Sequence, residues 1–207
     1  MSYQPRERFR TTTFVSILAA CFLSSLLSQT TVAMECRDLE KAGVIPDVLP
    51  ASACHELSVQ VDIEFPSGSP TRGSPMPLRA VTECPKIILS RKPEKGQKFV
   101  VFLTDPDAPS RLNPVAAEWA HWVASTEGTT IQSNSKTFLP YAPPTPPKGT
   151  GAHRYVALVY LGDTSRLSGV PSASKRKQWG GRRHAHAVAS ENGLQLVGVD
   201  WFTVEHK

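Results

Sequence analysis

The chain has 207 residues, of which 40% are hydrophobic and 20% are charged, and its formal net charge is +5. This length allows one domain with a substantial core but leaves little room for a second, and the composition is that of a globular protein. The charge is too small to imply nucleic acid as a partner by itself, and no nucleic-acid partner is expected.

The first 33 residues are predicted to be a secretory signal peptide. Arg6, Arg8 and Arg10 precede an apolar run from Phe14 to Leu27, and small residues follow up to Ala33. The apolar run is shorter than the roughly 20 residues that a membrane-spanning helix needs. An uncleaved signal anchor is the alternative. The predicted mature domain spans residues 34–207 and, because the leader holds three Arg and one Glu, has a formal charge of +3.

Cys21 belongs to the leader, which leaves Cys36, Cys54 and Cys84 in the predicted mature chain. In an oxidising compartment, one disulfide and one free thiol are the simplest arrangement. A bridge between Cys36 and Cys54 would tie the N-terminal segment to the first strand region, but the sequence leaves the pairing open. No C-x-x-C occurs, so a cysteine zinc site is not expected. A metal site of His121, His153 and Asp105 is a chemical alternative, because these are suitable ligand types, but no metal-ligand spacing supports it. No metal or other cofactor is predicted.

The N-terminal half of the predicted domain begins with a short helix from Glu35 to Ala42, which ends at Gly43. From Leu57 to Phe65, apolar and polar side chains alternate, which predicts a strand with one buried face. The Pro-, Gly- and Ser-rich stretch from Pro66 to Pro77 is expected to be an exposed loop.

Further strands are predicted at Lys86 to Ser90, Phe99 to Thr104, His121 to Ser125, Arg154 to Leu161 and Gln195 to Val204. Two of these, Phe99 to Thr104 and Arg154 to Leu161, are apolar on both faces and should be central strands. The proline-rich segment from Pro140 to Pro147 is stiff and cannot join the interior of a sheet. A helix from His184 to Glu191 stops at Asn192-Gly193. The pattern predicts one β-rich domain with short peripheral helices.

A basic cluster comprises Lys175-Arg176-Lys177 and Arg182-Arg183-His184. We interpret it as a solvated loop or helix face, and contact with an acidic membrane or partner is the alternative.

Polar side chains gather where the two central strands meet proline-stiffened loops. Asp105 and Asp107 follow one central strand, His153 precedes the other, and His121 begins the strand between them. Two histidines, an arginine and loop amides suit an anion. The aspartates fit such a site if they hydrogen-bond the imidazoles and raise their pKa values, or if the ligand also carries a cation. Taken singly, each group has a structural alternative, as a turn or as a hydrogen-bonded core histidine.

Two segments, Asp105 to Arg111 with Glu118 to His121, and Pro146 to Tyr155, resemble the signature regions of the phosphatidylethanolamine-binding (Raf kinase inhibitor-like) family. Residues 44–49 and 193–202 are similar to its first and final segments, so the resemblance spans nearly all of residues 37–205. It implies a mainly β fold, with one large antiparallel sheet, a smaller sheet and short flanking helices. It also implies an anion pocket at the surface.

The resemblance implies which residues form this pocket. The ligand-binding residues are expected to be Asp105, His121, Pro146, Pro147, His153 and Tyr155, and the supporting residues Asp107, Arg111 and Arg154. A structural ion pair between Arg154 and the aspartate loop is the alternative for that arginine. Ala120 stands where many members have a second histidine, and Thr145 where a glycine often precedes the Pro-Pro pair, so a side chain is added to the rim.

The implied function is non-catalytic binding of a phospholipid headgroup, such as phosphoethanolamine, or another small anion. Family members also regulate proteins, among them kinases and, in fungi, a vacuolar serine carboxypeptidase. A signal peptide favours a serine peptidase in the secretory pathway, the vacuole or outside the cell over a cytosolic kinase. Membrane contact is expected to be peripheral at most. If imidazolium groups hold a phosphate, affinity should fall as the pH rises through about 6.5.

A hydrolase is the alternative from a different class. Asp105, His121 and Ser110 are the residue types of a hydrolytic triad. Ser110, however, lies in a proline-bounded turn without a G-x-S-x-G elbow or an oxyanion-hole motif. We therefore do not expect an enzyme.

Overall fold

Two strands that are apolar on both faces organise the fold. The computed structural model describes residues 36–177, 179 and 184–207, so the predicted signal peptide lies outside the described residues. β4 (Lys98–Asp105) and β8 (Ala152–Gly162) pair antiparallel at the centre of a six-stranded sheet, which confirms the prediction for both. Successive side chains of each strand enter two different cores, one on each face of the sheet.

The large sheet has the order β2-β9-β8-β4-β5-β7. Its other members are β2 (Pro75–Met76), β5 (Trp119–Thr126), β7 (Lys136–Leu139) and β9 (Gln195–Glu205). All neighbours are antiparallel except β2, which runs parallel to β9. The segment from Pro66 to Pro77 was predicted to be a loop throughout, and this is wrong for Pro75 and Met76, which form β2. Pro75 is compatible with β2 because this strand lies at the edge of the sheet.

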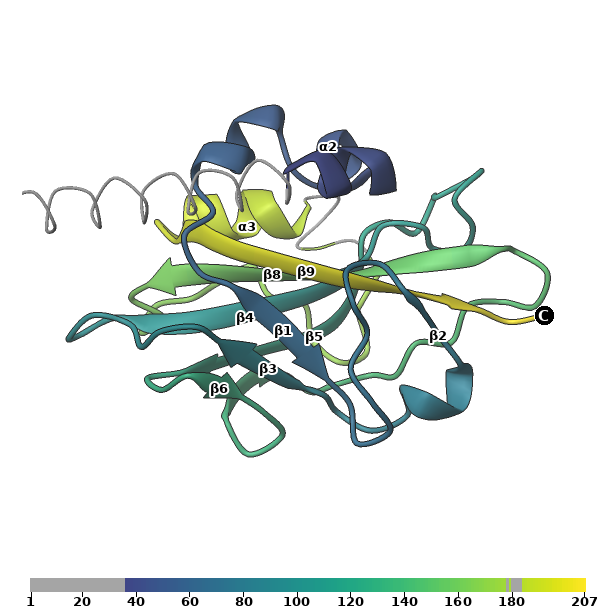
Figure 1. Ribbon diagram of the computed structural model, residues 1–207. Coiled ribbons are helices and arrows are strands. Elements are labelled where there is room, and N and C mark those ends of the chain that lie inside the picture. The colour runs from purple at the N-terminus through teal and green to yellow at the C-terminus, as the bar shows by residue number, and fades with distance from the viewer. Residues whose placement is uncertain (1–35, 178, 180–183) are drawn as a thin grey trace, which may run out of the picture.

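A smaller antiparallel sheet covers one face of the large one (Figure 1) and has the order β1-β3-β6. It consists of β1 (Val61–Glu64), β3 (Lys86–Leu89) and β6 (Thr130–Ile131). The predicted alternation holds from Leu57 to Phe65, but the segment is divided between the sheets. The N–H groups of Ser58 and Val59 donate to Val197 O in β9, and only β1 itself pairs with β3. Gly198 permits this approach, because a Cβ there would lie 2.6 Å from Val59 O.

Helices cover the other face of the large sheet (Figure 1). Residues 36–42 are helical and are followed by α2 (Val44–Asp47) and a 3₁₀ helix (Ala51–His55), and α3 (Ala185–Glu191) lies beside them. A second 3₁₀ helix (Leu78–Ala80) follows β2. Cys36 and Cys54 form a disulfide and Cys84 is free, which is the expected arrangement and settles the pairing. None of the helices in the described residues is long and apolar enough to cross a membrane.

Each core contains a cluster of aromatic rings. On the helical side, the Phe102 ring lies 5.3 Å from Tyr160 and 5.2 Å from Trp179 between centroids. Between the sheets, Phe202 stacks on Tyr155 at 5.3 Å and meets Phe65 edge-on at 5.2 Å. These contacts add to the burial of large apolar surfaces and hold the strands that carry the site at fixed separations.

Asp200 is a buried carboxylate at the junction of the two sheets. It lies in β9, its residue is 4% exposed, and its oxygens accept hydrogen bonds from the N–H of Ile63 in β1 (3.2 Å) and of Trp201 (2.8 Å). Burial raises the pKa of this carboxyl from 3.8 to about 7, although both hydrogen bonds act in the opposite direction. Asp200 therefore changes charge near neutral pH while it joins β1 to β9.

We predict that the Asp200 carboxyl makes the free energy of unfolding decrease as the pH rises from about 4 to about 7, and that Asp200→Asn removes this decrease. The folded state keeps the Asp200 proton up to a pH of about 7, whereas the unfolded chain releases it near 3.9. The stability that this carboxyl contributes is therefore complete below the unfolded pKa and is lost as the pH rises through the folded pKa. Denaturant titrations across this range measure the difference, with the exposed Glu205→Gln as the control. Equal pH slopes for Asp200→Asn and the wild type would contradict the prediction.

Candidate functional site

Three strand ends meet at one edge of the large sheet. β4 ends at Asp105, and its two neighbours β5 and β8 begin beside it, because both run antiparallel to it. The loop that follows β4 and the proline-rich segment that precedes β8 therefore lie around the same point. This arrangement brings together polar residues that are far apart in the sequence.

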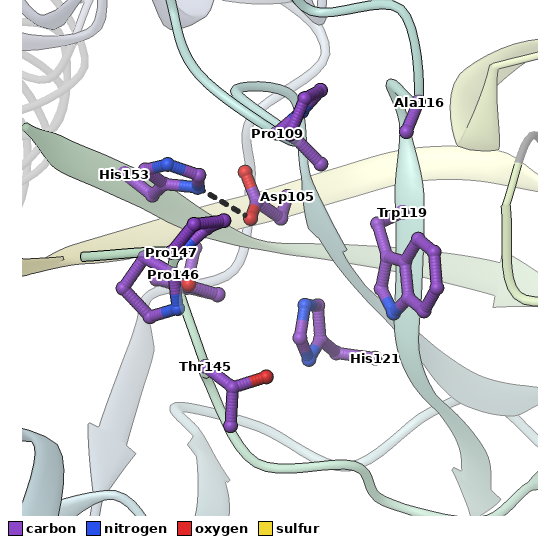
Figure 2. A pocket seen from close by; sticks show the side chains of 11 residues that line it. Asp105, Pro109, Ala116, Trp119, His121, Thr145, Pro146, Pro147 and His153 are labelled. Carbon is purple, nitrogen blue, oxygen red and sulfur yellow. Dashed lines mark hydrogen bonds and ion pairs between the residues drawn. The ribbon is translucent and has the colours of Figure 1, made fainter. Parts of the chain in front are cut away.

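A cavity of about 190 Å³ opens among these strand ends (Figure 2). All six residues that were expected to bind a ligand line it, together with five others: Asp105, His121, Pro146, Pro147, His153 and Tyr155, with Ala108, Pro109, Ala116, Trp119 and Thr145. Pockets for drug-sized ligands have volumes of about 300–1,000 Å³. The cavity is therefore sized for a ligand smaller than a drug-sized molecule.

A β-bulge places His121 in the cavity. Leu103 pairs with Trp122 and Thr104 pairs with Ala120, so His121 is an extra residue in β5. Bulges redirect side chains and are common beside binding sites. Ala120, one of the two departures from the family pattern, packs in the core on the helical side and does not line the cavity.

The His121 ring has one nitrogen left for a ligand. Its Nδ1–H donates to the carbonyl of Ala142 (2.7 Å), and the ring lies edge-on to Tyr155 with 5.1 Å between centroids. Burial lowers the pKa of His121, and the Arg176 charge acts in the same direction, against the Ala142 carbonyl and Asp105. Asp105 therefore raises the pKa of His121, in the direction considered for the aspartates, but the effect of burial is larger. In its neutral form Nε2 is a hydrogen-bond acceptor.

His153 is held between Asp105 and Thr150. Its Nδ1 lies 2.9 Å from Asp105 Oδ2, and its Nε2 lies 3.0 Å from Thr150 Oγ1, whose hydroxyl donates to Pro147 O (2.8 Å). The Nδ1–H of His153 can donate to the Asp105 carboxylate, so the imidazole and the carboxylate are held as a hydrogen-bonded pair at the cavity.

Tyr155 brings a hydroxyl to the cavity that has no partner within the described residues. Burial raises the pKa of this phenol, and the nearby Asp105 charge adds to the effect, although the two groups are not in hydrogen-bonding geometry. Buried polar groups are normally hydrogen-bonded. The Tyr155 hydroxyl is therefore a donor that a ligand in the cavity can satisfy.

Asp107 and Arg154 lie behind the cavity and form a buried ion pair. Arg154 Nε and Nη2 donate to the two Asp107 oxygens at 2.9 Å and 2.6 Å, and the Arg154 N–H donates to Oδ2 at 2.8 Å. Arg154 Nη1 bonds Gly43 O (2.6 Å) and Asp47 Oδ2 (2.8 Å). This is the structural alternative that the sequence left open. It joins the start of β8, the aspartate loop and the N-terminal segment.

Arg111 belongs to the same network and does not line the cavity. It is half-exposed, donates to Ala42 O (3.3 Å) and lies 3.8 Å from Asp47. Gly43, whose φ is +69°, lies beside both arginines, and a Cβ there would be 3.0 Å from Arg154 Nη1. No Arg or Lys is among the described residues that line the cavity, and Arg111 and Arg154, which were expected to be supporting residues, lie outside it.

Arg176 is a supporting residue that the sequence analysis missed. It is buried, and it donates to the carbonyls of Ala120 (3.0 Å), His121 (2.9 Å) and Pro140 (2.6 Å). It thus ties β5 to the proline-rich segment on both sides of His121. The interpretation of a solvated basic face is wrong for this residue, although Lys175 and Lys177 are exposed. Arg182 and Arg183 lie outside the described residues.

Trp119 and Thr145 also line the cavity (Figure 2). Trp119 is the cross-strand partner of Asp105 and lies two residues before His121. This period of two is a sequence signal that could have identified it. Thr145 lines the cavity at the position where an added side chain was expected at the rim.

The described residues do not assemble the catalytic or metal sites that were weighed as alternatives. Ser110 Oγ accepts a hydrogen bond from Asn113 N (3.2 Å), and Ser110 is not among the residues that line the cavity. No group of three or more His, Cys, Asp or Glu side chains within these residues could hold a metal ion.

Comparison with known proteins gave consistent matches. A family model described as phosphatidylethanolamine-binding protein matches residues 66–196. A Plasmodium falciparum protein with this family name is 32% identical over 81% of this chain and 96% of its own length. The carboxypeptidase Y inhibitor of Saccharomyces cerevisiae is 29% identical over 81% of this chain and 93% of its own length.

Two solved structures share the fold. A phosphatidylethanolamine-binding protein from Plasmodium vivax has a TM-score of 0.77 and 26% identity, covering 83% of this chain and 97% of that chain. A carboxypeptidase Y inhibitor, complexed with its cognate proteinase, has a TM-score of 0.72 and 26% identity, covering 84% and 96%.

We predict unequal effects for the two arginines that contact the N-terminal segment. Arg154→Leu should lower the free energy of unfolding by about 3–5 kcal/mol, because it leaves the Asp107 carboxylate buried without a partner. Arg111→Leu should lower it by less than about 1 kcal/mol, because that side chain is half-exposed and screened by solvent. Denaturant titration of both variants measures the contrast, and similar losses would overturn the assignment of Arg154 as the central bridge.

Proposed function

This chain belongs to the phosphatidylethanolamine-binding protein family, and we propose that it is a non-catalytic module whose pocket binds a phospholipid headgroup or another small phosphate-bearing zwitterion. The observation that carries the proposal is the balance of charge in the cavity. Asp105 is paired with His153, His121 has a lowered pKa, and no Arg or Lys is among the described lining residues. The cavity offers no excess of positive charge to balance a simple anion. A zwitterion needs none, because it carries a positive charge of its own.

The lining groups supply a partner for each end of such a ligand. The phosphate accepts a hydrogen bond from the free Tyr155 hydroxyl, and from Nε2 of His121 once that ring is protonated. The ammonium group lies against the Trp119 ring, since aromatic faces attract cations. Thr145 and Pro147 limit the width of the mouth, so a methylated ammonium group should bind less well.

A second candidate is inhibition of a serine peptidase. The similarity to carboxypeptidase Y inhibitor over nearly all of that protein's length supports it. The Cys36–Cys54 disulfide supports a route through the secretory pathway, to the vacuole or outside the cell, because disulfides persist in oxidising compartments. Residual activity of purified carboxypeptidase Y, titrated with this protein, tests the candidate directly.

We expect isothermal titration calorimetry to show saturable, one-site binding of phosphoethanolamine. His121→Ala should weaken it by at least roughly tenfold, the equivalent of one hydrogen bond to a charged group. The exposed His55→Ala is the matched control and should bind like the wild type. Absence of binding by the wild-type protein would contradict the headgroup proposal and leave peptidase inhibition as the candidate to pursue.

The affinity for phosphoethanolamine should fall as the pH rises. The pKa of His121 lies below 6.5 in the free protein, and a bound phosphate raises it, so binding takes up a proton. Affinity is then greatest below the free pKa and declines until the pH passes the bound pKa. Calorimetry at several pH values, in buffers of different ionisation enthalpy, measures the affinity and the proton uptake. Constant affinity from about pH 5 to pH 8 would exclude this role of His121.

A further inference from the structure

One loop beside the pocket holds both large hydrophobic residues that are exposed within residues 36–177, 179 and 184–207. Leu112 is 99% exposed and Val115 is 58% exposed. Single exposed apolar residues are common on protein surfaces and need no explanation. Here, however, the two lie three positions apart, whereas the other large apolar side chains of the described chain are buried or partly buried. The loop at residues 109–115 therefore has an unusual surface for this protein.

This loop is attached rigidly to the wall of the pocket. Ala108 and Ala116 line the cavity at its two ends, and the Ala116 N–H donates to Ala108 O (3.0 Å) to close it. Within it, the Asn113 N–H donates to Ser110 O (3.1 Å). Figure 2 shows Pro109 and Ala116 along one side of the cavity. Whatever contacts the loop is thus held at the pocket.

The two segments that wall the pocket carry no acidic residue. Residues 108–117 contain Arg111 and no Asp or Glu, and residues 141–151, on the other side, contain the exposed Lys148 and no Asp or Glu. The nearby carboxylates of Asp47 and Asp107 are paired with arginines. Apolar side chains accompanied by cations suit the interface of a membrane that carries phosphate groups.

The size of the cavity adds an independent constraint. About 190 Å³ accommodates a headgroup but not the acyl chains of a phospholipid. A lipid whose headgroup enters the pocket must leave its glycerol and acyl chains outside the mouth. If those chains stay in a bilayer, the segments around the mouth lie at the bilayer surface.

We propose that the pocket takes its headgroup from a lipid bilayer and that the loop at residues 109–115 docks on that bilayer. Leu112 and Val115 enter the interfacial region, and Arg111 and Lys148 face lipid phosphates. The inference rests on the proposed headgroup binding and adds its source. Contact of this kind is peripheral.

The test compares membrane-bound and free headgroup with the same variants. Vesicles of phosphatidylcholine, phosphatidylethanolamine and phosphatidylserine are sedimented with the protein, and free phosphoethanolamine is titrated in parallel. The double variant Leu112→Ser with Val115→Ser should bind vesicles at least roughly tenfold more weakly, as removal of two interfacial apolar side chains predicts. Its affinity for free phosphoethanolamine should not change, because neither side chain lines the cavity. His121→Ala should weaken the binding of both vesicles and free phosphoethanolamine.

A tryptophan substitution gives a second readout. Leu112→Trp should bind vesicles more tightly than the wild type, and its fluorescence should shift to the blue when vesicles are added, relative to the wild-type protein. Asn134→Trp, on an exposed loop between β6 and β7, is the control and should show no added shift. Insertion of the loop tip predicts a shift only for Leu112→Trp.

The outcomes separate the two proposals. If the wild type binds free phosphoethanolamine and the serine variant binds vesicles as tightly as the wild type, membrane docking is overturned and headgroup binding stands. If the wild type binds neither vesicles nor phosphoethanolamine, headgroup binding itself is overturned. If the serine variant loses inhibition of carboxypeptidase Y but keeps vesicle binding, the loop is a protein interface and the docking proposal is wrong.

Discussion

The ion pair between Arg154 and Asp107 is the constraint on which the rest of the site depends. Both side chains are buried, and the guanidinium bonds both carboxylate oxygens in a geometry that only arginine provides. Through the remaining nitrogen of Arg154, the bridge also holds the N-terminal segment at Gly43 and Asp47. Asp105 lies two residues before Asp107, and His153 lies one residue before Arg154. The ion pair therefore holds both pocket residues in place, although its own charges lie outside the cavity.

Charge in the pocket is controlled by where the cations are placed. Arg154 is neutralised by aspartates, and the buried Arg176 donates to three carbonyls around β5 and the proline-rich segment. Neither guanidinium lines the cavity, where burial keeps the pKa of His121 low. The ligand therefore meets the hydrogen-bonded pair of Asp105 and His153, one histidine that can gain a proton and one hydroxyl without a partner in the described residues. This set of groups favours a small molecule that carries both signs of charge over a bare anion, and it makes binding sensitive to pH.

The strands that build the site were readable from the sequence because their side-chain patterns are strong. β4 and β8 are apolar on both faces, and Leu57 to Phe65 alternates without interruption. Short elements such as β2 and β6 escaped prediction because two residues form no periodic pattern. The burial of Arg176 also escaped, because adjacent lysines give the same sequence signal whether the residue between them is solvated or not. Its acceptors come from residues 36 or more positions away.

The sequence by itself determined the identity of the central strands and the family resemblance, and through that resemblance it named six of the eleven residues that line the pocket. These follow from local pattern and from motifs read in order. Only the tertiary structure decided what those residues do to one another. The bulge at His121 depends on the register between β4 and β5, the pairing of His153 with Asp105 joins residues 48 positions apart, and the pKa of His121 depends on how deeply the assembled chain buries it. Register, long-range hydrogen bonds and burial exist only once distant segments are packed together, which is why no local pattern encodes them.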